Sequence, residues 1–389
     1  MHFNPYPFEK LRNLLSECQP QKTGINLSIG EPAFESPGCV VDAIKTHASS
    51  IRYYPSVQNE LLQAQQAFVA KRFCVDICDK EIVPTFGSRE VLFNFPHFLC
   101  LSRKLKSNKA TIAFPNPFYQ IYEGVQIANN ANVIYMPLTN ENNFKPSLSR
   151  EDLARVDIVI LNSPNNPTGQ ALSIDELKQW VRWALEYDVV VINDECYSEI
   201  YEGMPTASIL EASILESPNE RFKNIFAINS LSKRLSVPGL RSGFIAGDGE
   251  VLQEYKVFRN YVGISMPLVL QQASIIAWRE EKYANYIRGK FAANLALARE
   301  IFPDCSVFPY AFYLWLPIHS QEQTNDSIDE DFVKELFVRT GHKVLPGSYL
   351  GREGAGKGFV RIALTQEEQT MRDVLVEIRA VYDDFICKK

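Results

Sequence analysis

The chain has 389 residues, more than a single hydrophobic core usually organises, so the sequence predicts two domains. Its composition, 46% hydrophobic and 22% charged, is ordinary for a globular protein and excludes fibrous and disordered classes. A net charge of -6 leaves no basic excess for binding nucleic acid. No apolar run is long enough to cross a bilayer, and the first ten residues lack the pattern of a signal peptide. We therefore expect a cytoplasmic protein with no membrane partner.

The middle of the chain alternates short β-rich runs with longer amphipathic stretches. The stretch Ile174–Tyr187 has a helical pattern and begins with Ser173 as a candidate N-cap. This alternation predicts an α/β fold in which a mainly parallel sheet lies between helices. The runs predicted as strands are Thr111–Phe114, Val133–Pro137, Ile158–Leu161, Val189–Ile192, Ile225–Ile228 and Ser242–Gly247.

The pattern changes after Met266. Long helical patterns over Leu268–Ile301 lead to two shorter predicted strands, Phe312–Leu316 and Phe359–Leu364, and to a final helix, Glu367–Ile386. These elements predict a second, smaller α+β domain. Because ligands of open α/β sheets bind at the carboxyl ends of the strands, we expect the functional residues directly after the strands of the larger domain.

Polar segments follow two consecutive predicted strands. The segment Asn162–Gly169 is rich in turn-forming residues, and it is either a tight loop or a loop whose Asn166 offers an amide to a ligand. Asp194 emerges from the next strand, with Tyr197 three residues later. This acid is either a helix cap or a partner for a cationic ring nitrogen with a phenol nearby, and the segment alone leaves both open.

The segment after Ile225–Ile228 is the most specific. Ser230 and Ser232 precede Lys233, and Arg241 follows eight residues later, before another predicted strand. Hydroxyl groups and a guanidinium can hold a phosphate beside a nucleophilic amine. A purely structural role for these residues is therefore less favoured than for the two preceding segments.

Together, Asn-Pro-Thr-Gly (166–169), Asp-x-x-Tyr (194–197) and Ser-x-Ser-Lys…Arg-x-Gly (230–243) resemble class I and II aminotransferases. These are fold-type I enzymes that depend on pyridoxal 5'-phosphate (PLP), and the resemblance covers essentially the whole chain. It implies an N-terminal arm that belongs to a small domain, a large PLP-binding domain and a small C-terminal domain, at residues 1–40, 41–266 and 267–389.

The resemblance implies roles for the residues at the ends of the strands. Lys233 matches the lysine that bonds the cofactor and moves a proton at the substrate Cα. Asp194 matches the acid that pairs with the pyridine nitrogen. Tyr197 and Asn166 match the groups that bind the cofactor ring oxygen, and Asn166 also reaches the substrate carboxylate.

Other residues match the groups that hold the remaining parts of the cofactor. Tyr119 matches the aromatic residue that stacks on the pyridine ring. Tyr54, or Tyr53 instead, matches a tyrosine that reaches the phosphate from the partner subunit, which implies a homodimer with shared active sites. The glycine usual in the family is missing after this pair. The phosphate site itself combines helix-start N–H groups with hydroxyls and a guanidinium, from Gly87, Ser88, Arg89, Ser230, Ser232 and Arg241.

The resemblance also implies how the substrate is held. Arg361 matches the arginine that clamps the α-carboxylate, since its planar guanidinium gives two parallel hydrogen bonds, and the Gly30 backbone approaches the same group. The blocks at 5–12, 115–124 and 345–351 are similar to bacterial N-succinyldiaminopimelate aminotransferases. This narrower likeness implies reversible transamination of N-succinyl-2-amino-6-oxopimelate, with glutamate and 2-oxoglutarate as the donor pair.

Three alternatives stay open. An aspartate, aromatic or general amino-acid aminotransferase would share the cofactor residues, and so would a PLP-dependent C–S β-lyase. A non-enzymatic partner-binding module on the same fold is the third. The eight cysteines are scattered, and Cys74 and Cys78 lack the further ligands of a zinc site. We expect free thiols and no metal.

Overall fold

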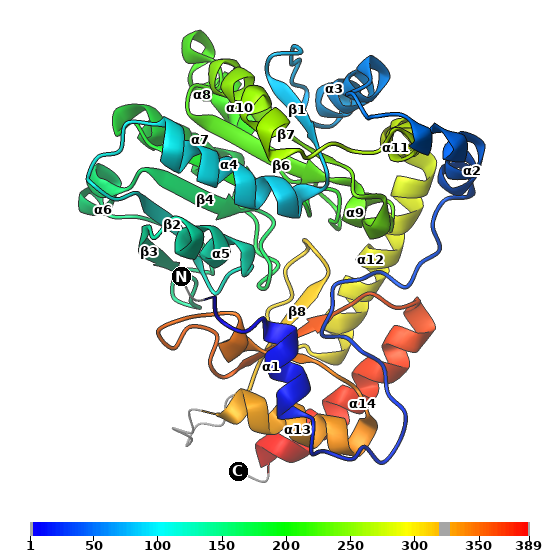
Figure 1. Cartoon of the computed structure of the whole chain (residues 1–389). Coiled ribbons are helices and arrows are strands. Elements are labelled where there is room, and N and C mark those ends of the chain that lie inside the picture. The colour runs from blue at the N-terminus through cyan, green and yellow to red at the C-terminus, as the bar shows by residue number, and fades with distance from the viewer. Residues whose placement is uncertain (1–2, 319–326, 388–389) are drawn as a thin grey trace.

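The computed structural model describes residues 3–318 and 327–387, which form two units, each built on its own sheet (Figure 1). Within these residues the larger sheet has seven strands in the order β1-β7-β6-β5-β4-β2-β3. Neighbours from β3 to β6 are parallel, whereas β7 is antiparallel to both β6 and β1. The strands are β1 (Ile82–Thr85), β2 (Thr111–Asn116), β3 (Asn132–Pro137), β4 (Ile158–Asn162), β5 (Val190–Asp194), β6 (Ile225–Ser230) and β7 (Gly243–Gly247).

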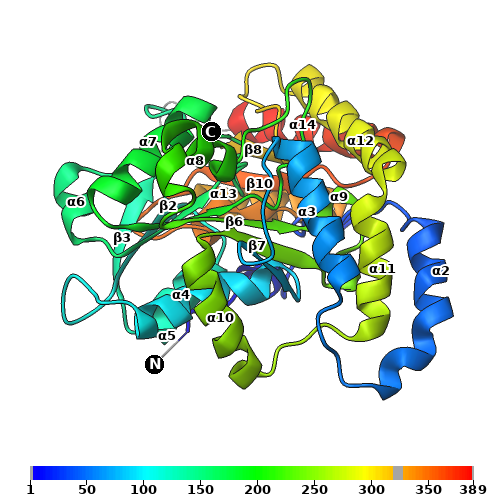
Figure 2. The ribbon, with the colours of Figure 1, turned by 90° about the horizontal axis from the view of Figure 1, so that it is seen from above.

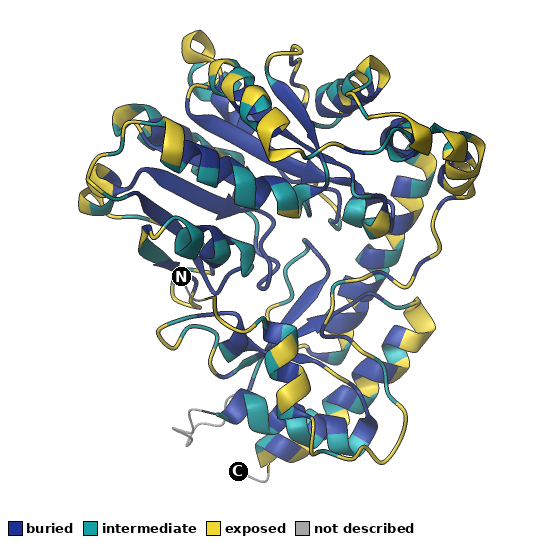
Figure 3. Ribbon diagram, viewed as in Figure 1, coloured by how far each residue is buried: buried dark blue, intermediate teal, exposed yellow. Residues whose placement is uncertain are grey.

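Helices cover both faces of this sheet (Figure 2), and its strands are buried apart from the edge strand β3 (Figure 3). Side chains alternate between the two faces along each strand. Val190 and Ile192 therefore pack with α4, α5 and α10, whereas Val191 packs with α3, α7, α8 and α11. The helices of this unit are α2 (Gly38–His47), α3 (Asn59–Phe73), α4 (Ser88–Ser102), α5 (Ile121–Ala128), α6 (Arg150–Arg155), α7 (Ile174–Glu186), α8 (Ile209–Glu216), α9 (Leu231–Arg234), α10 (Gly249–Val262) and α11 (Leu268–Arg279).

The smaller unit has an antiparallel sheet in the order β8-β10-β9 and a separate core. Leu11 and Leu27, from the start of the chain, are buried in this core, so the N-terminal segment packs with the C-terminal part. We propose a domain boundary near residue 40 on this basis, whereas α11, which follows the predicted boundary at residue 266, packs in the core of the larger unit. The elements of this unit are α1 (Pro7–Leu14), β8 (Tyr313–Pro317), α13 (Ile328–Thr340), β9 (Leu345–Pro346), β10 (Phe359–Ala363) and α14 (Glu368–Cys387).

The long helix α12 (Glu281–Ile301) links the two cores. Ala284 near its start packs in the core of the larger unit, and Leu295 packs in the core of the smaller one. Across residues 3–318 and 327–387, no helix combines the length and apolar composition needed to cross a membrane.

Most predicted elements form, with ends shifted by one or two residues. β5 and β6 extend to Asp194 and Ser230, so these two side chains belong to the strands rather than to the loops after them. Ser173 caps α7, and its capping box with Glu176 is complete. The pattern over 268–301 is divided at Glu280 into α11 and α12. The sequence did not predict β1, a short edge strand that contains a proline.

A contact between the units lies beside the loop that carries Tyr119. Asn116 Nδ2 donates to the Arg352 carbonyl (2.9 Å), and the Arg352 N–H donates to Asn116 Oδ1 (3.0 Å). The Arg352 guanidinium also donates two 2.6 Å hydrogen bonds to the carboxylate of buried Glu123 in α5. Such a bidentate pair fixes both distance and orientation. The smaller unit is therefore held against the carboxyl edge of the large sheet.

Candidate active site

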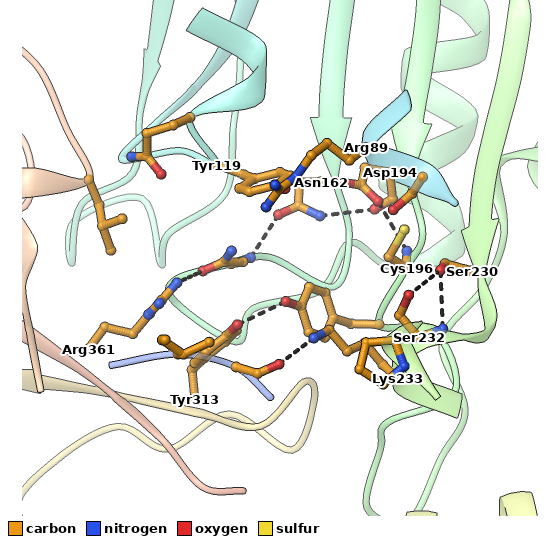
Figure 4. A pocket seen from close by; sticks show the side chains of 18 of the residues that line it. Arg89, Tyr119, Asn162, Asp194, Cys196, Ser230, Ser232, Lys233, Tyr313 and Arg361 are labelled. Carbon is orange, nitrogen blue, oxygen red and sulfur yellow. Dashed lines mark hydrogen bonds between the residues drawn. The ribbon is translucent and has the colours of Figure 1, made fainter. Parts of the chain in front are cut away.

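A cavity of about 470 Å³ lies at the carboxyl ends of β4, β5 and β6 (Figure 4). The strand register pairs Asn162 with Asp194 and Asp194 with Ile228, two residues before Ser230. The ends of adjacent strands therefore place these polar side chains next to one another at the wall of the cavity. The predicted site residues that line this cavity are Gly30, Ser88, Arg89, Tyr119, Asn166, Asp194, Tyr197, Ser230, Ser232, Lys233, Arg241 and Arg361.

Three predicted residues do not line the cavity. Gly87 lies behind Arg241: a Cβ at this position would be 2.4 Å from Arg241 Nη2, and its φ of +80° also favours glycine. Tyr54 is fully exposed and Tyr53 is largely exposed on the surface of the chain. Neither tyrosine reaches the cavity of its own chain, so their predicted role across a subunit interface stays a prediction.

Lys233 is placed by the turn from β6 into the short helix α9. The Ser230 side chain accepts the N–H of Ser232 (3.2 Å) and caps this helix. Lys233 Nζ then donates to the Gly30 carbonyl, and it lies 5.4 Å from the centre of the Phe312 ring. Within the described residues it forms no ion pair with a carboxylate. Burial lowers the pKa of Lys233 to about 8, so a far larger fraction of this amine is uncharged and nucleophilic near neutral pH than for a lysine with the ordinary pKa.

The reactivity of Lys233 should therefore follow this pKa of about 8 rather than the ordinary 10.5. Only the neutral amine is a nucleophile, so acylation of the cofactor-free protein should be slow below pH 8 and level off above it. The labelled peptide can be quantified by mass spectrometry from about pH 6 to pH 11, a range that brackets both values. Exposed Lys45 serves as the internal control. A midpoint for Lys233 that coincides with that of Lys45 would contradict the prediction.

Asp194 is a buried acid with no cationic partner among the described residues. Tyr122 donates its hydroxyl to Oδ2 (2.7 Å), and the Cys196 N–H donates to Oδ1 (3.2 Å). Burial raises the pKa of Asp194, while these hydrogen bonds oppose the shift. In the part of the chain that the structure describes, no lysine or arginine forms an ion pair with it. A protonated ring nitrogen would supply the missing charge, because a nearby cation favours the ionised carboxylate.

Arg361 enters the cavity from β10 of the smaller unit. Its Nη1 donates to Asn166 Oδ1 (2.7 Å) and its Nη2 to the Ser28 carbonyl (2.6 Å). The guanidinium lies 4.6 Å from the centre of the Tyr313 ring, whose hydroxyl is 2.9 Å from that of Tyr197. Buried Nε has no hydrogen-bond partner among the described residues. A guanidinium held in this way can bind a carboxylate with two parallel hydrogen bonds.

Hydroxyls, a guanidinium and a helix start meet at the other end of the cavity. Ser230 Oγ donates to Ser232 Oγ (3.0 Å), and Arg241 Nη1 donates to the Pro238 carbonyl (2.8 Å). Helix α4 begins at Ser88 nearby, where unpaired N–H groups and the helix dipole favour an anion. This donor set fits a phosphate dianion. With the neutral amine of Lys233 and the unpaired acid at 194, these groups fit PLP.

Among the residues that the sequence did not predict, Tyr313 lines the cavity and Tyr122 donates a hydrogen bond to Asp194. Tyr119 lies in the loop just before α5, and Tyr122, three residues later, lies in the first turn of this helix, with the two ring centroids 5.8 Å apart. That spacing was the available signal. Tyr313 opens β8, far along the chain from Tyr197, and only the packing of the two units brings them together.

The cysteines are free thiols, as predicted, and Cys74 and Cys78 are exposed. In residues 3–318 and 327–387, no three or more His, Cys, Asp or Glu side chains are grouped in a way that could hold a metal ion.

The comparisons agree with this geometry. The family model for class I and II aminotransferases matches residues 22–378. Curated relatives include LL-diaminopimelate aminotransferases from Aquifex aeolicus (28% identical) and Syntrophobacter fumaroxidans (27%), each match covering 96% of both chains.

Solved structures are similar over nearly the whole chain. The aminotransferase AspB from Helicobacter pylori 26695 has a TM-score of 0.94 and 47% identity, and the match covers 99% of this chain and 100% of that one. An aminotransferase from Neisseria meningitidis Z2491 has a TM-score of 0.88 and 32% identity, with 98% of each chain covered. Because the family model spans most of the sequence, this chain belongs to the class I and II aminotransferases, fold-type I enzymes that use pyridoxal 5'-phosphate.

Proposed function

We propose that this enzyme transfers an amino group between glutamate and a 2-oxo acid, with Lys233 as the residue bonded to PLP. The observation that carries the proposal is the shared cavity of Lys233, Asp194 and Arg361, in which the amine has a pKa of about 8 and the acid lacks a cation. When bound, PLP supplies an aldehyde and a ring that accepts the electron pair left at the substrate Cα.

The residues around the cavity have separable tasks in this proposal. Asp194, fixed by Tyr122, holds a proton on the ring nitrogen through charge pairing. Tyr197 and Asn166 bind the ring oxygen. Ser230, Ser232 and Arg241, with the N–H groups of the turn Gly87–Arg89, hold the phosphate, and Tyr119 stacks on the ring.

Proton transfer at the substrate Cα is assigned to Lys233 Nζ. The amine is a base near neutral pH because its pKa is lowered to about 8, close to the value that suits a general base. Arg361 orients the α-carboxylate, and this fixes which face of Cα meets Nζ. Lys233 is half-buried at the wall of the cavity, which limits the access of bulk water to the proton that it carries.

For the substrate, we propose N-succinyl-2-amino-6-oxopimelate, on the strength of the sequence blocks at 5–12, 115–124 and 345–351. The second candidate is LL-diaminopimelate, for which the relatives from Aquifex aeolicus and Syntrophobacter fumaroxidans are named. Those names do not support the succinyl group. Both candidates are built on the pimelate chain with a carboxylate at each end, but the first carries an N-succinyl group on one amine and an oxo group in place of the other amine.

The test is to assay purified holoenzyme with 2-oxoglutarate and a panel of amino donors, measuring the glutamate formed. The donors are N-succinyl-LL-diaminopimelate, LL-diaminopimelate, aspartate and tyrosine. We expect the highest kcat/KM with the succinylated donor, and a higher value with LL-diaminopimelate would select the second candidate. Release of pyruvate from cystathionine would indicate β-lyase activity. Absence of glutamate with every donor would contradict the proposed function.

We also propose a homodimer in which Tyr54 of each subunit reaches the partner's cofactor phosphate. Tyr54 is fully exposed, and Ile51, Tyr53 and Val57 beside it are exposed as well. Exposed apolar and aromatic side chains that are close in sequence are typical of an interface. Sedimentation equilibrium should give twice the chain mass of 44.2 kDa, and the mass of one chain would exclude the dimer.

A further inference from the structure

We propose that Tyr313 is a positioning residue for the cofactor: its hydroxyl donates to Tyr197 and so directs the Tyr197 hydroxyl at the ring oxygen. This inference rests on the proposed function, in which Tyr197 binds that oxygen, and it adds a residue of the smaller unit to the site. Tyr313 opens β8 and lines the same cavity as Tyr197 and Lys233. The larger unit supplies the phenol that binds the ring, and the smaller unit supplies the phenol behind it.

The two phenols are held with their hydroxyls together in a buried position. Their oxygens are 2.9 Å apart, and the rings meet edge to face with centroids 5.7 Å apart. Both side chains are buried. The Tyr313 hydroxyl also packs against the backbone of Gly30, where an added Cβ would overlap with it. This packing leaves the Tyr313 oxygen little room to move away from Tyr197.

The number of protons on the pair determines the direction of their hydrogen bond. Each phenol carries one proton, and the contact between them uses one of the two. Within residues 3–318 and 327–387, neither hydroxyl has another hydrogen-bond partner, so one proton remains for a ligand. Burial raises the pKa of Tyr197, so this hydroxyl stays protonated at neutral pH and can donate.

The donor to the ring oxygen must therefore be the acceptor within the pair. Because Tyr197 donates its only proton to the ring oxygen in the proposed function, its own oxygen can only accept the proton of Tyr313. The result is a chain of two hydrogen bonds that runs from Tyr313 through Tyr197 to the ring. Hydrogen bonds in such a chain polarise and strengthen one another, so Tyr313 acts on the ring without touching it.

The ring of Tyr313 has a second contact, which links the pair to the substrate. In the small sheet Tyr313 is paired with Ala363, two residues after Arg361, so Tyr313 and Arg361 project from the same face. The Arg361 guanidinium lies 4.6 Å from the centre of the Tyr313 ring, and Figure 4 shows both on the side of the cavity away from Asp194. The hydroxyl of Tyr313 thus supports the group assigned to the cofactor, and its ring supports the group assigned to the α-carboxylate.

The first experiment measures binding of pyridoxamine 5'-phosphate to the cofactor-free protein, because this ligand has the ring oxygen but no aldehyde for Lys233. Its 3-deoxy analogue, in which hydrogen replaces the ring hydroxyl, is the paired ligand. Y313F should weaken binding of pyridoxamine 5'-phosphate about tenfold, the upper range for one hydrogen bond, and leave binding of the analogue unchanged. Y255F is the matched control: Tyr255 is fully buried and lies outside the cavity, so this variant should bind both ligands as the parent does.

A double variant and the kinetics test whether Tyr313 acts through Tyr197. Y197F should lose at least as much affinity for pyridoxamine 5'-phosphate as Y313F, and combining the two should cause no further loss, because the chain is already broken. With glutamate as the donor, Y313F should lower kcat and leave KM unchanged. Y313L should raise KM as well, because it also removes the ring beside Arg361.

The outcomes separate this inference from the proposed function. Equal losses for the two ligands in Y313F, or losses that add in the double variant, would overturn the inference and leave Tyr313 as a packing residue. If the parent binds pyridoxamine 5'-phosphate but transfers no amino group from glutamate, the proposed function fails, and the binding ratios still decide the role of Tyr313. A parent protein that binds neither ligand would overturn both.

Discussion

Replacing Lys233 with alanine is expected to lower kcat for amino transfer from glutamate by about 10⁴-fold, the upper range for loss of a general base. The variant loses the buried amine whose pKa is lowered to about 8, and in the described part of the cavity no second lysine is present. A coupled assay of 2-oxoglutarate formation measures the rate. Circular dichroism should show an unchanged fold, because this side chain faces the cavity rather than a packed core.

The covalent role of Lys233 is tested separately by borohydride reduction of the parent holoenzyme. The cofactor should then be found on the peptide containing Lys233, and the alanine variant should release its cofactor on denaturation. Lys290→Ala is the matched control, because Lys290 pairs with Glu367 on the surface. Its rate should equal that of the parent enzyme. Recovery of the cofactor on another lysine, or more than a tenth of the parental rate in the alanine variant, would refute the assignment.

The second large effect is expected at Asp194. Changing Asp194 to asparagine keeps its size and the hydrogen bond from Tyr122 but removes the negative charge. The ring nitrogen then loses the partner that keeps it protonated, and kcat should fall about 10³-fold, a typical cost of removing one preorganised electrostatic group. The absorbance spectrum of the bound cofactor should shift as well, which a general loss of stability would not cause.

The neighbouring acid provides a matched control. Glu195 is also buried, but its carboxylate accepts from the Ile209 N–H (2.8 Å) and the Ser208 hydroxyl (3.0 Å), and it does not line the cavity. Glu195→Gln should therefore lower Tm and leave kcat within a few-fold of the parental value, since it disturbs only a structural network. A spectral shift in this variant, or none in Asp194→Asn, would show that the wrong acid has been assigned.

The gathering of polar side chains at the strand ends was predictable because short spacings place these residues close together, and their chemical roles rest on the family resemblance. Asp194 and Tyr197 are separated by three residues, as are Ser230 and Lys233, and a strand end followed by a tight turn brings such neighbours together whatever surrounds them. The N-cap Ser173 belongs to the same class of local signals. These predictions required only that a strand end, a turn and the direction of the chain be recognised in the local sequence.

The residues that were missed depend on contacts that no local pattern encodes. From the sequence pattern alone, Tyr122 is an ordinary apolar residue of an amphipathic helix. Its hydroxyl lies 2.7 Å from Asp194 only because the fold places the end of β5 beside it. The pairing of Tyr197 with Tyr313 joins residues 116 positions apart. The antiparallel position of β7 between β6 and β1 likewise depends on the route of the chain between distant strands.

The contact of Arg352 with Asn116 and Glu123 ties the loop that carries Tyr119 to the smaller unit. Tyr119 lies in the loop between these two residues and also accepts a hydrogen bond from Arg89. An outward rotation of the smaller unit must either break the Arg352 bonds together or draw this aromatic ring along with it. One set of contacts therefore determines both how the smaller unit sits and where the Tyr119 ring lies.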